Sequence, residues 1–144
     1  MNGDFFLDTN IFIYSLDPKH PAKRATAREL IQAALSSRRG VISWQVVQEC
    51  VHVLRKKCDV AMTPEHCRMY LDEVLLPLCA VHSSREVHRH AFDLHERQGI
   101  SFHDALIVAA AYEAGCDRLL TEDMQHGQTV AGLTIVNPFL AATR

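Results

Sequence analysis

The chain has 144 residues, of which 48% are hydrophobic, and a formal net charge of −2, a composition that excludes a disordered protein and allows one domain with one core. Because no apolar run reaches the roughly 18 residues of a membrane span and the first residues lack a basic signal-peptide start, we expect a cytoplasmic protein with no membrane partner. The five cysteines include no Cys-x-x-Cys pair, which argues against a disulfide framework or a cysteine zinc site.

The first predicted element is a short strand over residues 5–7, which is followed by Asp8-Thr9-Asn10. A continuous apolar run is typical of a parallel strand that helices cover on both faces. An acid at the carboxyl end of such a strand lies at the edge of the sheet where open α/β folds bind ligands. Asp8 or Asn10 could equally serve only to cap the next helix, and this stretch alone leaves both interpretations open.

Helical and strand patterns then alternate along the chain. Helices are predicted over residues 20–37, 44–57, 63–76 and 85–97, and in a run at 105–111 that is apolar on all sides and therefore buried. Further strands are predicted over residues 41–43, 78–82, 118–120 and 133–136. This alternation indicates βαβ units, so we predict an α/β fold with a mostly parallel sheet.

Three more acids occupy the starts of predicted helices or the end of a strand. Glu49 lies in the second turn of a helix and borders its buried stripe, Asp104 begins the apolar helix, and Asp123 follows a strand together with Glu122. Simpler explanations exist for two of them. Glu49 could be an ordinary surface residue, and Ser101 with Asp104 has the spacing of a capping box.

If the strand order reverses between the first and fourth strands, Asp8 and Asp123 flank the crevice at the switch point, with Glu49 and Asp104 nearby. Four carboxylates there would repel one another unless cations neutralised them, and Mg²⁺ or Mn²⁺ suits such oxygen ligands. Two such ions can activate water and stabilise the leaving oxygen in phosphodiester hydrolysis. Setting these four aside leaves thirteen acids against fifteen lysines and arginines, so the remaining surface is net +2 and could hold a phosphate backbone.

Together and in this order, the motifs resemble those of the PIN-domain family, and most of all the VapC-type ribonuclease toxins of bacterial toxin–antitoxin pairs. The resemblance covers nearly the whole chain, and its carriers are residues 6–10, Glu49, residues 101–107, residues 119–123 and the closing stretch 132–139. It implies a single three-layer α/β/α domain over residues 1–144, with a mostly parallel central sheet.

The same resemblance implies site residues and partners. The family's catalytic, metal-binding acids, which use Mg²⁺ or Mn²⁺, are matched by Asp8, Glu49, Asp104 and Asp123. Its supporting polar residues are matched by Thr9, Asn10 and Thr121, and Glu122 beside Asp123 leaves two choices for the fourth acid, of which we favour Asp123. The implied protein is an endoribonuclease toxin that cleaves RNA, forms a homodimer and is inhibited by an antitoxin protein.

Two other functions share some of these features. A non-catalytic RNA-binding or scaffold PIN-like domain is the main alternative, but such domains typically lose one or more acids, and all four positions are filled here. A phosphotransfer receiver also has acids at strand ends, but it normally has a lysine after a late strand, and no lysine occurs beyond Lys57.

Partner surfaces follow less directly from the residues. Candidates for the basic rim that contacts RNA are Arg38, Arg39, Arg55, Lys56 and Arg89. The apolar helix near residues 63–76 is a candidate for the face that packs on a second copy or on an antitoxin.

Overall fold

The computed structural model describes residues 3–56 and 61–140. Within them, six strands form one sheet in the order β3-β2-β1-β4-β6-β5. The strands are β1 (Phe5–Leu7), β2 (Gly40–Ser43), β3 (Cys79–Val81), β4 (Arg118–Leu120), β5 (Thr129–Val130) and β6 (Leu133–Val136). Every neighbouring pair is parallel except β5 with β6, which confirms the predicted mostly parallel sheet.

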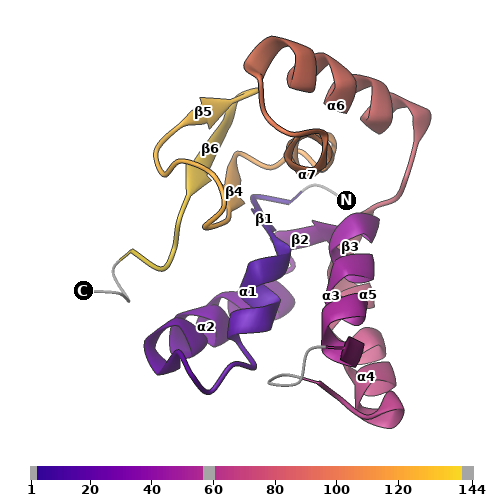
Figure 1. The fold of residues 1–144 in the computed structure, drawn as a ribbon, viewed down its shortest axis with the longest axis vertical. Helices are drawn as coiled ribbons and strands as arrows, with labels where there is room; N and C mark the ends of the chain where they lie inside the picture. The colour runs from indigo at the N-terminus through magenta and orange to yellow at the C-terminus, as the bar shows by residue number, and fades with distance from the viewer. Residues whose placement is uncertain (1–2, 57–60, 141–144) are drawn as a thin grey trace.

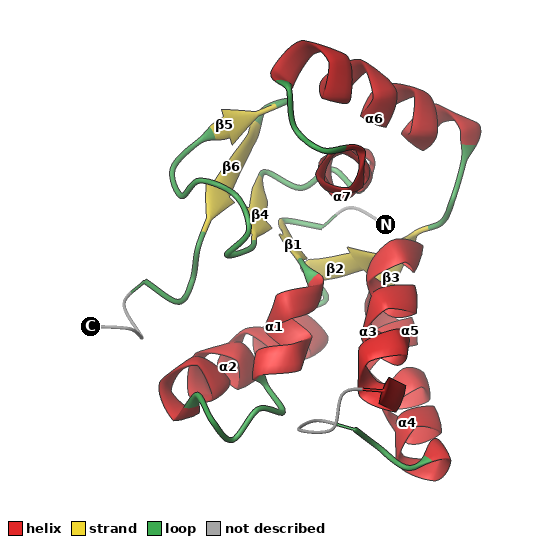
Figure 2. Cartoon of the chain, viewed as in Figure 1, coloured by secondary structure: helices red, strands yellow, loops and turns green. Residues whose placement is uncertain are grey.

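Helices cover both faces of this sheet. The helical elements are α1 (Thr9–Tyr14), α2 (Pro21–Ser37), α3 (Trp44–Lys56), α4 (Pro64–Tyr70), the π-helical turn η1 (Leu71–Leu75), α5 (Leu76–Leu78), α6 (Arg85–Gln98) and α7 (Phe102–Glu113). Helices α6 and α7 lie on one face and α1 to α5 on the other (Figures 1 and 2), so the predicted three-layer α/β/α architecture is confirmed. In the described part of the chain, no helix combines the length and the apolar character that crossing a membrane requires.

The chain winds outward from the centre of the sheet in two directions. From β1 it proceeds to β2 and β3 on one side, and it then returns to form β4 on the other side of β1. The strand order therefore reverses between β1 and β4, as the sequence analysis required for a shared crevice. Leu7 is in register with Leu120, so the residues that follow them, Asp8 and Thr121, emerge side by side.

The core lies on both sides of β1. Phe6 and Leu7 are fully buried, and α7 packs against β2, β4 and β6 with the buried run Ile107–Ala111. The residues from 107 to 111 are all small or β-branched, and the three alanines let this helix approach the sheet closely. The prediction that the all-apolar helix is buried is thus confirmed, and Ser101 caps its start by accepting a hydrogen bond from the Asp104 N–H at 3.0 Å.

The structure differs from the predicted elements at two places. The third predicted helix does not stop before Pro77 but continues to Leu78, because η1 widens the helix there and the Leu76 N–H reaches the Leu71 carbonyl. Strand β5 was not predicted; Ala131 and Gly132, both with positive φ, turn it back on β6 in a hairpin. Lys57, the last residue of the second predicted helix, lies outside the described residues.

Candidate active site

Asp8 directly follows β1 and is only 7% exposed. Its Oδ1 accepts a hydrogen bond from the Thr9 N–H at 2.7 Å, so it caps α1, and its Oδ2 accepts one from the Thr121 hydroxyl at 2.8 Å. Both interpretations of this residue are therefore compatible, because it caps a helix and also lies at the switch point. The pKa of Asp8 is raised to about 6, chiefly by burial and to a smaller extent by the charges of Asp123 and Glu49, while these hydrogen bonds lower it.

Asp123 is joined to Asp8 through Thr121 and Asn10. The Asp123 N–H donates to the Thr121 hydroxyl oxygen at 3.1 Å, and the Asn10 amide nitrogen donates to Asp123 Oδ2 at 3.2 Å and to Thr121 at 3.5 Å. Asn10 Oδ1 is buried and has no hydrogen-bond partner among the described residues. An unpartnered buried oxygen beside two carboxylates suits a cation or a water molecule that a cation holds.

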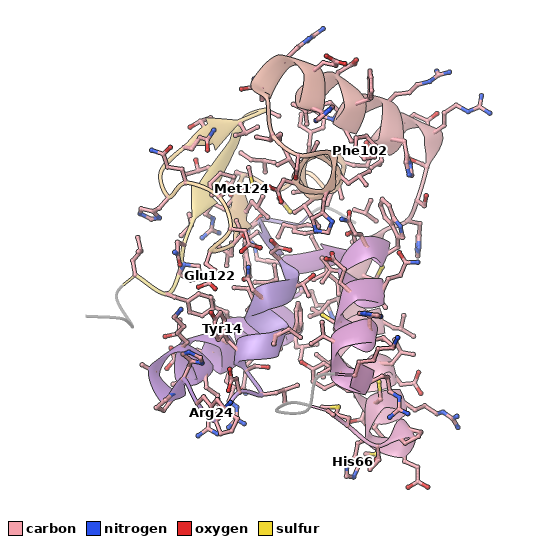
Figure 3. The ribbon with its side chains drawn as sticks, viewed as in Figure 1. Tyr14, Arg24, His66, Phe102, Glu122 and Met124 are labelled. Atoms are coloured by element: carbon pink, nitrogen blue, oxygen red, sulfur yellow. The ribbon has the colours of Figure 1, made fainter. Side chains whose placement is uncertain are left out.

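Glu122, the neighbour of Asp123, has different surroundings. Its Oε1 accepts a hydrogen bond from the Tyr14 hydroxyl at 2.6 Å, and its Oε2 lies 3.1 Å from the Lys23 ammonium, which also lies 4.6 Å from the centre of the Tyr14 ring. Figure 3 labels Tyr14 and Glu122, which lie where α1 approaches the segment after β4. The charge of Glu122 is thus neutralised by Lys23, whereas among the described residues the Asp123 carboxylate accepts a hydrogen bond only from the Asn10 amide.

Glu49 projects from the second turn of α3 and is 30% exposed. Its Oε1 accepts a hydrogen bond from the Thr9 hydroxyl at 3.3 Å, and its Oε2 lies 3.2 Å from His103 Nε2. The pKa of Glu49 is raised, chiefly by burial. The contacts with His103 and Thr9 lower this pKa, whereas the charges of Asp123 and Asp104 raise it. Glu49 is therefore not an ordinary surface glutamate, because its charge interacts with those of all three other acids.

Asp104 lies in the first turn of α7 and is partly buried. Its N–H completes the cap with Ser101, but within residues 3–56 and 61–140 its carboxylate accepts no hydrogen bond. The cap therefore depends on the backbone of Asp104 and leaves its side chain available to a ligand. The charge of Asp104 adds to the raised pKa of Glu49, so the two carboxylates are close enough for their charges to interact.

An open cleft of about 410 Å³ lies beside Glu49 and Asp123, and Asp8 and Asp104 are not among the residues that line it. It is lined by Thr9, Asn10, Ile13, Tyr14, Asp17, His20, Glu49, Val53, Glu122 and Asp123. Among the described residues, no three acidic, histidine or cysteine side chains are already close enough together to hold one ion. The oxygen donors nevertheless fit Mg²⁺ or Mn²⁺, since Mg²⁺ is usually held by one or two carboxylates and completes its shell with water and substrate phosphate.

The residues that hold these acids were not predicted from the sequence. Gln45 and His103, which meet beside Glu49, and Tyr14 and Lys23, which bind Glu122, were not singled out. One local signal was present: Gln45 precedes Glu49 by four residues and so shares its helix face. Lys23, on a different helix, carried no such signal.

Two of the candidate RNA-contact arginines lie far from the acids. Arg38 and Arg39 precede β2, and Arg39 pairs with Asp4 just before β1. They are at the amino ends of parallel strands, whereas Asp8 and Asp123 follow the carboxyl ends of β1 and β4. The contribution of Arg55, Lys56 and Arg89 to RNA binding stays a prediction.

Comparison with known proteins adds the following. The family profile described as PIN domain matches residues 5–130. One solved structure with a similar fold is a toxin–antitoxin complex from Klebsiella pneumoniae, with 20% identity, coverage of 94% of this chain and 98% of that chain, and a TM-score of 0.65. A second is DNA-bound VapBC from Salmonella typhimurium, with 20% identity, coverage of 92% of this chain and 96% of that chain, and a TM-score of 0.64. A third is VapC20 of Mycobacterium tuberculosis, described as a sarcin–ricin loop cleaving toxin, with 18% identity, coverage of 83% of this chain and 90% of that chain, and a TM-score of 0.59. No curated protein matches the chain.

The burial of Asp8 predicts a pH-dependent effect on stability. Its folded-state pKa of about 6 lies above the ordinary 3.8, so its contribution to stability is fully present below about pH 4 and is lost as the pH rises through about 6. In metal-free buffer at pH 8, Asp8→Asn should therefore raise the free energy of unfolding by about 2 kcal/mol. This corresponds to a rise of roughly 5 °C in the midpoint of thermal unfolding. Near pH 4 the gain should vanish.

Thermal unfolding at the two pH values measures this difference. Asp93→Asn, which changes an exposed aspartate on α6, is the matched control and should show no such dependence on pH. A loss of stability in Asp8→Asn of the same size at both pH values would contradict the assignment.

Proposed function

The chain belongs to the PIN-domain family, and on this premise we propose that it is a metal-dependent endoribonuclease that hydrolyses RNA phosphodiester bonds as the toxin of a toxin–antitoxin pair. One PIN-like domain would span residues 1–144. The observation that supports this most is the arrangement at the switch point. There the Thr121 hydroxyl is hydrogen-bonded to both Asp8 and Asp123, and the charges of Asp104 and Asp123 raise the pKa of Glu49. An acidic cluster of this kind at the ligand-binding edge of an α/β sheet suits divalent cations.

The metal ligands in this proposal are Asp8, Glu49, Asp104 and Asp123. Bound Mg²⁺ or Mn²⁺ would supply positive charge for the phosphate and an activated water. Thr121 and the Thr9 N–H hold the two oxygens of Asp8, and Asn10 holds Asp123, so these supporting residues fix the direction of the acids before RNA arrives. The reaction requires no serine or cysteine nucleophile and would leave a 5′-phosphate and a 3′-hydroxyl.

Asp123 is the better candidate for the fourth acid. Glu122 is already paired with Lys23 and accepts a hydrogen bond from Tyr14, and a carboxylate in this state would have to give up both contacts to bind a metal. The charge of Asp123 instead adds to the raised pKa values of Asp8 and Glu49, which supports its place among the proposed ligands.

The proposed partners follow from the proteins that share this fold. The similar structures from Klebsiella pneumoniae and Salmonella typhimurium are described as toxin–antitoxin and VapBC complexes, which supports an antitoxin protein as a partner here. The mycobacterial toxin is described as cleaving the sarcin–ricin loop, which supports RNA as the substrate. We extend this to a homodimer that acts in the cytoplasm.

Removing the metal or one acid should abolish RNA cleavage. The parent protein should cut a panel of structured RNAs with Mg²⁺ or Mn²⁺ and not with EDTA. Asp104→Asn should lower the cleavage rate by at least roughly 100-fold, or about 2.7 kcal/mol of transition-state stabilisation, because it removes a ligand charge from a side chain on which the fold does not depend.

Mass spectrometry first shows whether an antitoxin has co-purified. Gel analysis of RNA cleavage by antitoxin-free protein then measures the rates. Asp93→Asn should cleave like the parent. Equal cleavage by Asp104→Asn, or cleavage in EDTA, would rule out the proposed site.

A pair of neighbouring substitutions distinguishes the two candidates for the fourth acid. Asp123→Asn should lose cleavage, whereas Glu122→Gln should retain most of it and lose about 1 kcal/mol of stability, because Lys23 loses its countercharge at a partly exposed site. Cleavage rates and thermal unfolding of both variants measure this. The opposite pattern would identify Glu122 as the ligand.

A further inference from the structure

Glu49 is the proposed ligand whose carboxylate is held on both oxygens by other side chains. The Thr9 hydroxyl donates to Oε1, and His103 Nε2 faces Oε2 at 3.2 Å. These two contacts come from different elements, α1 and α7, while Glu49 itself is on α3. The direction of this flexible side chain is therefore determined by three helices that meet at the site.

His103 is in turn held by Gln45. The Gln45 amide nitrogen lies 3.4 Å from the His103 backbone carbonyl oxygen and 3.3 Å from His103 Nδ1. The carbonyl oxygen can only accept a hydrogen bond, so the amide must present its NH₂ group to it. The same NH₂ group then faces Nδ1, which must be the acceptor nitrogen of the ring. The proton is left on Nε2, where His103 donates it to Glu49 Oε2.

Gln45 is an unusual residue for its position. Only 8% of it is exposed, on a helix whose other buried residues are apolar, and its Oε1 has no hydrogen-bond partner within the described residues. An unpaired buried amide oxygen costs free energy that an apolar side chain of similar size would not. Stability therefore does not explain why a glutamine occupies this position, whereas its two contacts with His103 do.

We propose that Gln45 and His103 are positioning residues that hold the Glu49 carboxylate in the direction it needs to bind a divalent cation. The inference rests on the proposed function, in which Glu49 is a ligand. His103 donates to Oε2 and leaves the remaining lone pairs of the carboxylate for the metal, and Gln45 keeps the His103 ring in the tautomer that can donate. Outer contacts of this kind orient metal ligands, and their loss typically weakens metal binding by about 10- to 100-fold.

Titration of the metal-free full chain with Mn²⁺ alone tests this without RNA, with free Mn²⁺ followed by electron paramagnetic resonance. His103→Leu should weaken binding by about 10-fold or more. His103→Gln, whose amide can still donate to Glu49, should bind more tightly than His103→Leu. Gln45→Met should weaken binding while its midpoint of thermal unfolding stays at or above that of the parent, which a purely structural role for Gln45 would not produce.

Two further variants complete the experiment. His66→Gln removes an exposed histidine from α4, at the far end of the molecule from α7 (Figure 3), and should bind Mn²⁺ like the parent. In a Glu49→Gln background, His103→Leu should cause no additional loss, because His103 acts through Glu49. Should His103→Leu fail to fold, His103→Gln and Gln45→Met carry the same comparison.

The outcomes separate this inference from the proposed function. If the parent binds no Mn²⁺, the metal site and the positioning role both fail. If the parent binds Mn²⁺ and the His103 and Gln45 variants bind it equally well, the positioning role is wrong and the metal site stands. If His103→Leu weakened Mn²⁺ binding as much in the Glu49→Gln background as in the parent, the positioning role would also be wrong. His103 would then act on the metal by another route.

Discussion

The pairing of β1 with β4 is the constraint on which the rest of the site depends. It sets Leu7 beside Leu120, so that Asp8 and Thr121 leave the sheet together, and it buries a carboxylate where its negative charge is poorly solvated. Hydrogen bonds from Thr9 and Thr121 reduce the unfavourable effect of that burial but do not remove it, since the pKa of Asp8 remains about 6. A fold that maintains such a charge is suited to receive a cation.

The fold could be predicted from the sequence because its signals are local. Apolar runs mark residues 5–7, 118–120 and 133–136 as strands, and the cap residue Ser101 marks the start of α7. The four acids then followed from their positions at strand ends and helix starts. Strand β5 was missed because two residues are too few to show an alternating pattern.

The contacts among the acids and their partners could not be predicted in the same way. Whether His103 meets Glu49 or Lys23 meets Glu122 depends on how α1, α2, α3 and α7 are rotated and spaced when they pack on the sheet. Adjacent residues illustrate this most clearly: Glu122 and Asp123 look equivalent in sequence, yet one points to a lysine and a tyrosine and the other to an asparagine beside Asp8.

The burial of α7 and β1 has a consequence for how the candidate site comes apart on unfolding. Asp8 is attached to a strand at the centre of the sheet, and Asp104 to a helix whose residues from 107 to 111 are almost wholly enclosed. Elements of this kind exchange their amide hydrogens only when the whole domain opens, unlike loops and chain ends. We therefore expect Asp8 and Asp104 to lie in the slowest-exchanging part of the molecule, whereas Asp123 lies in the segment after β4. Denaturant should then separate these two acids only when the fold itself unfolds.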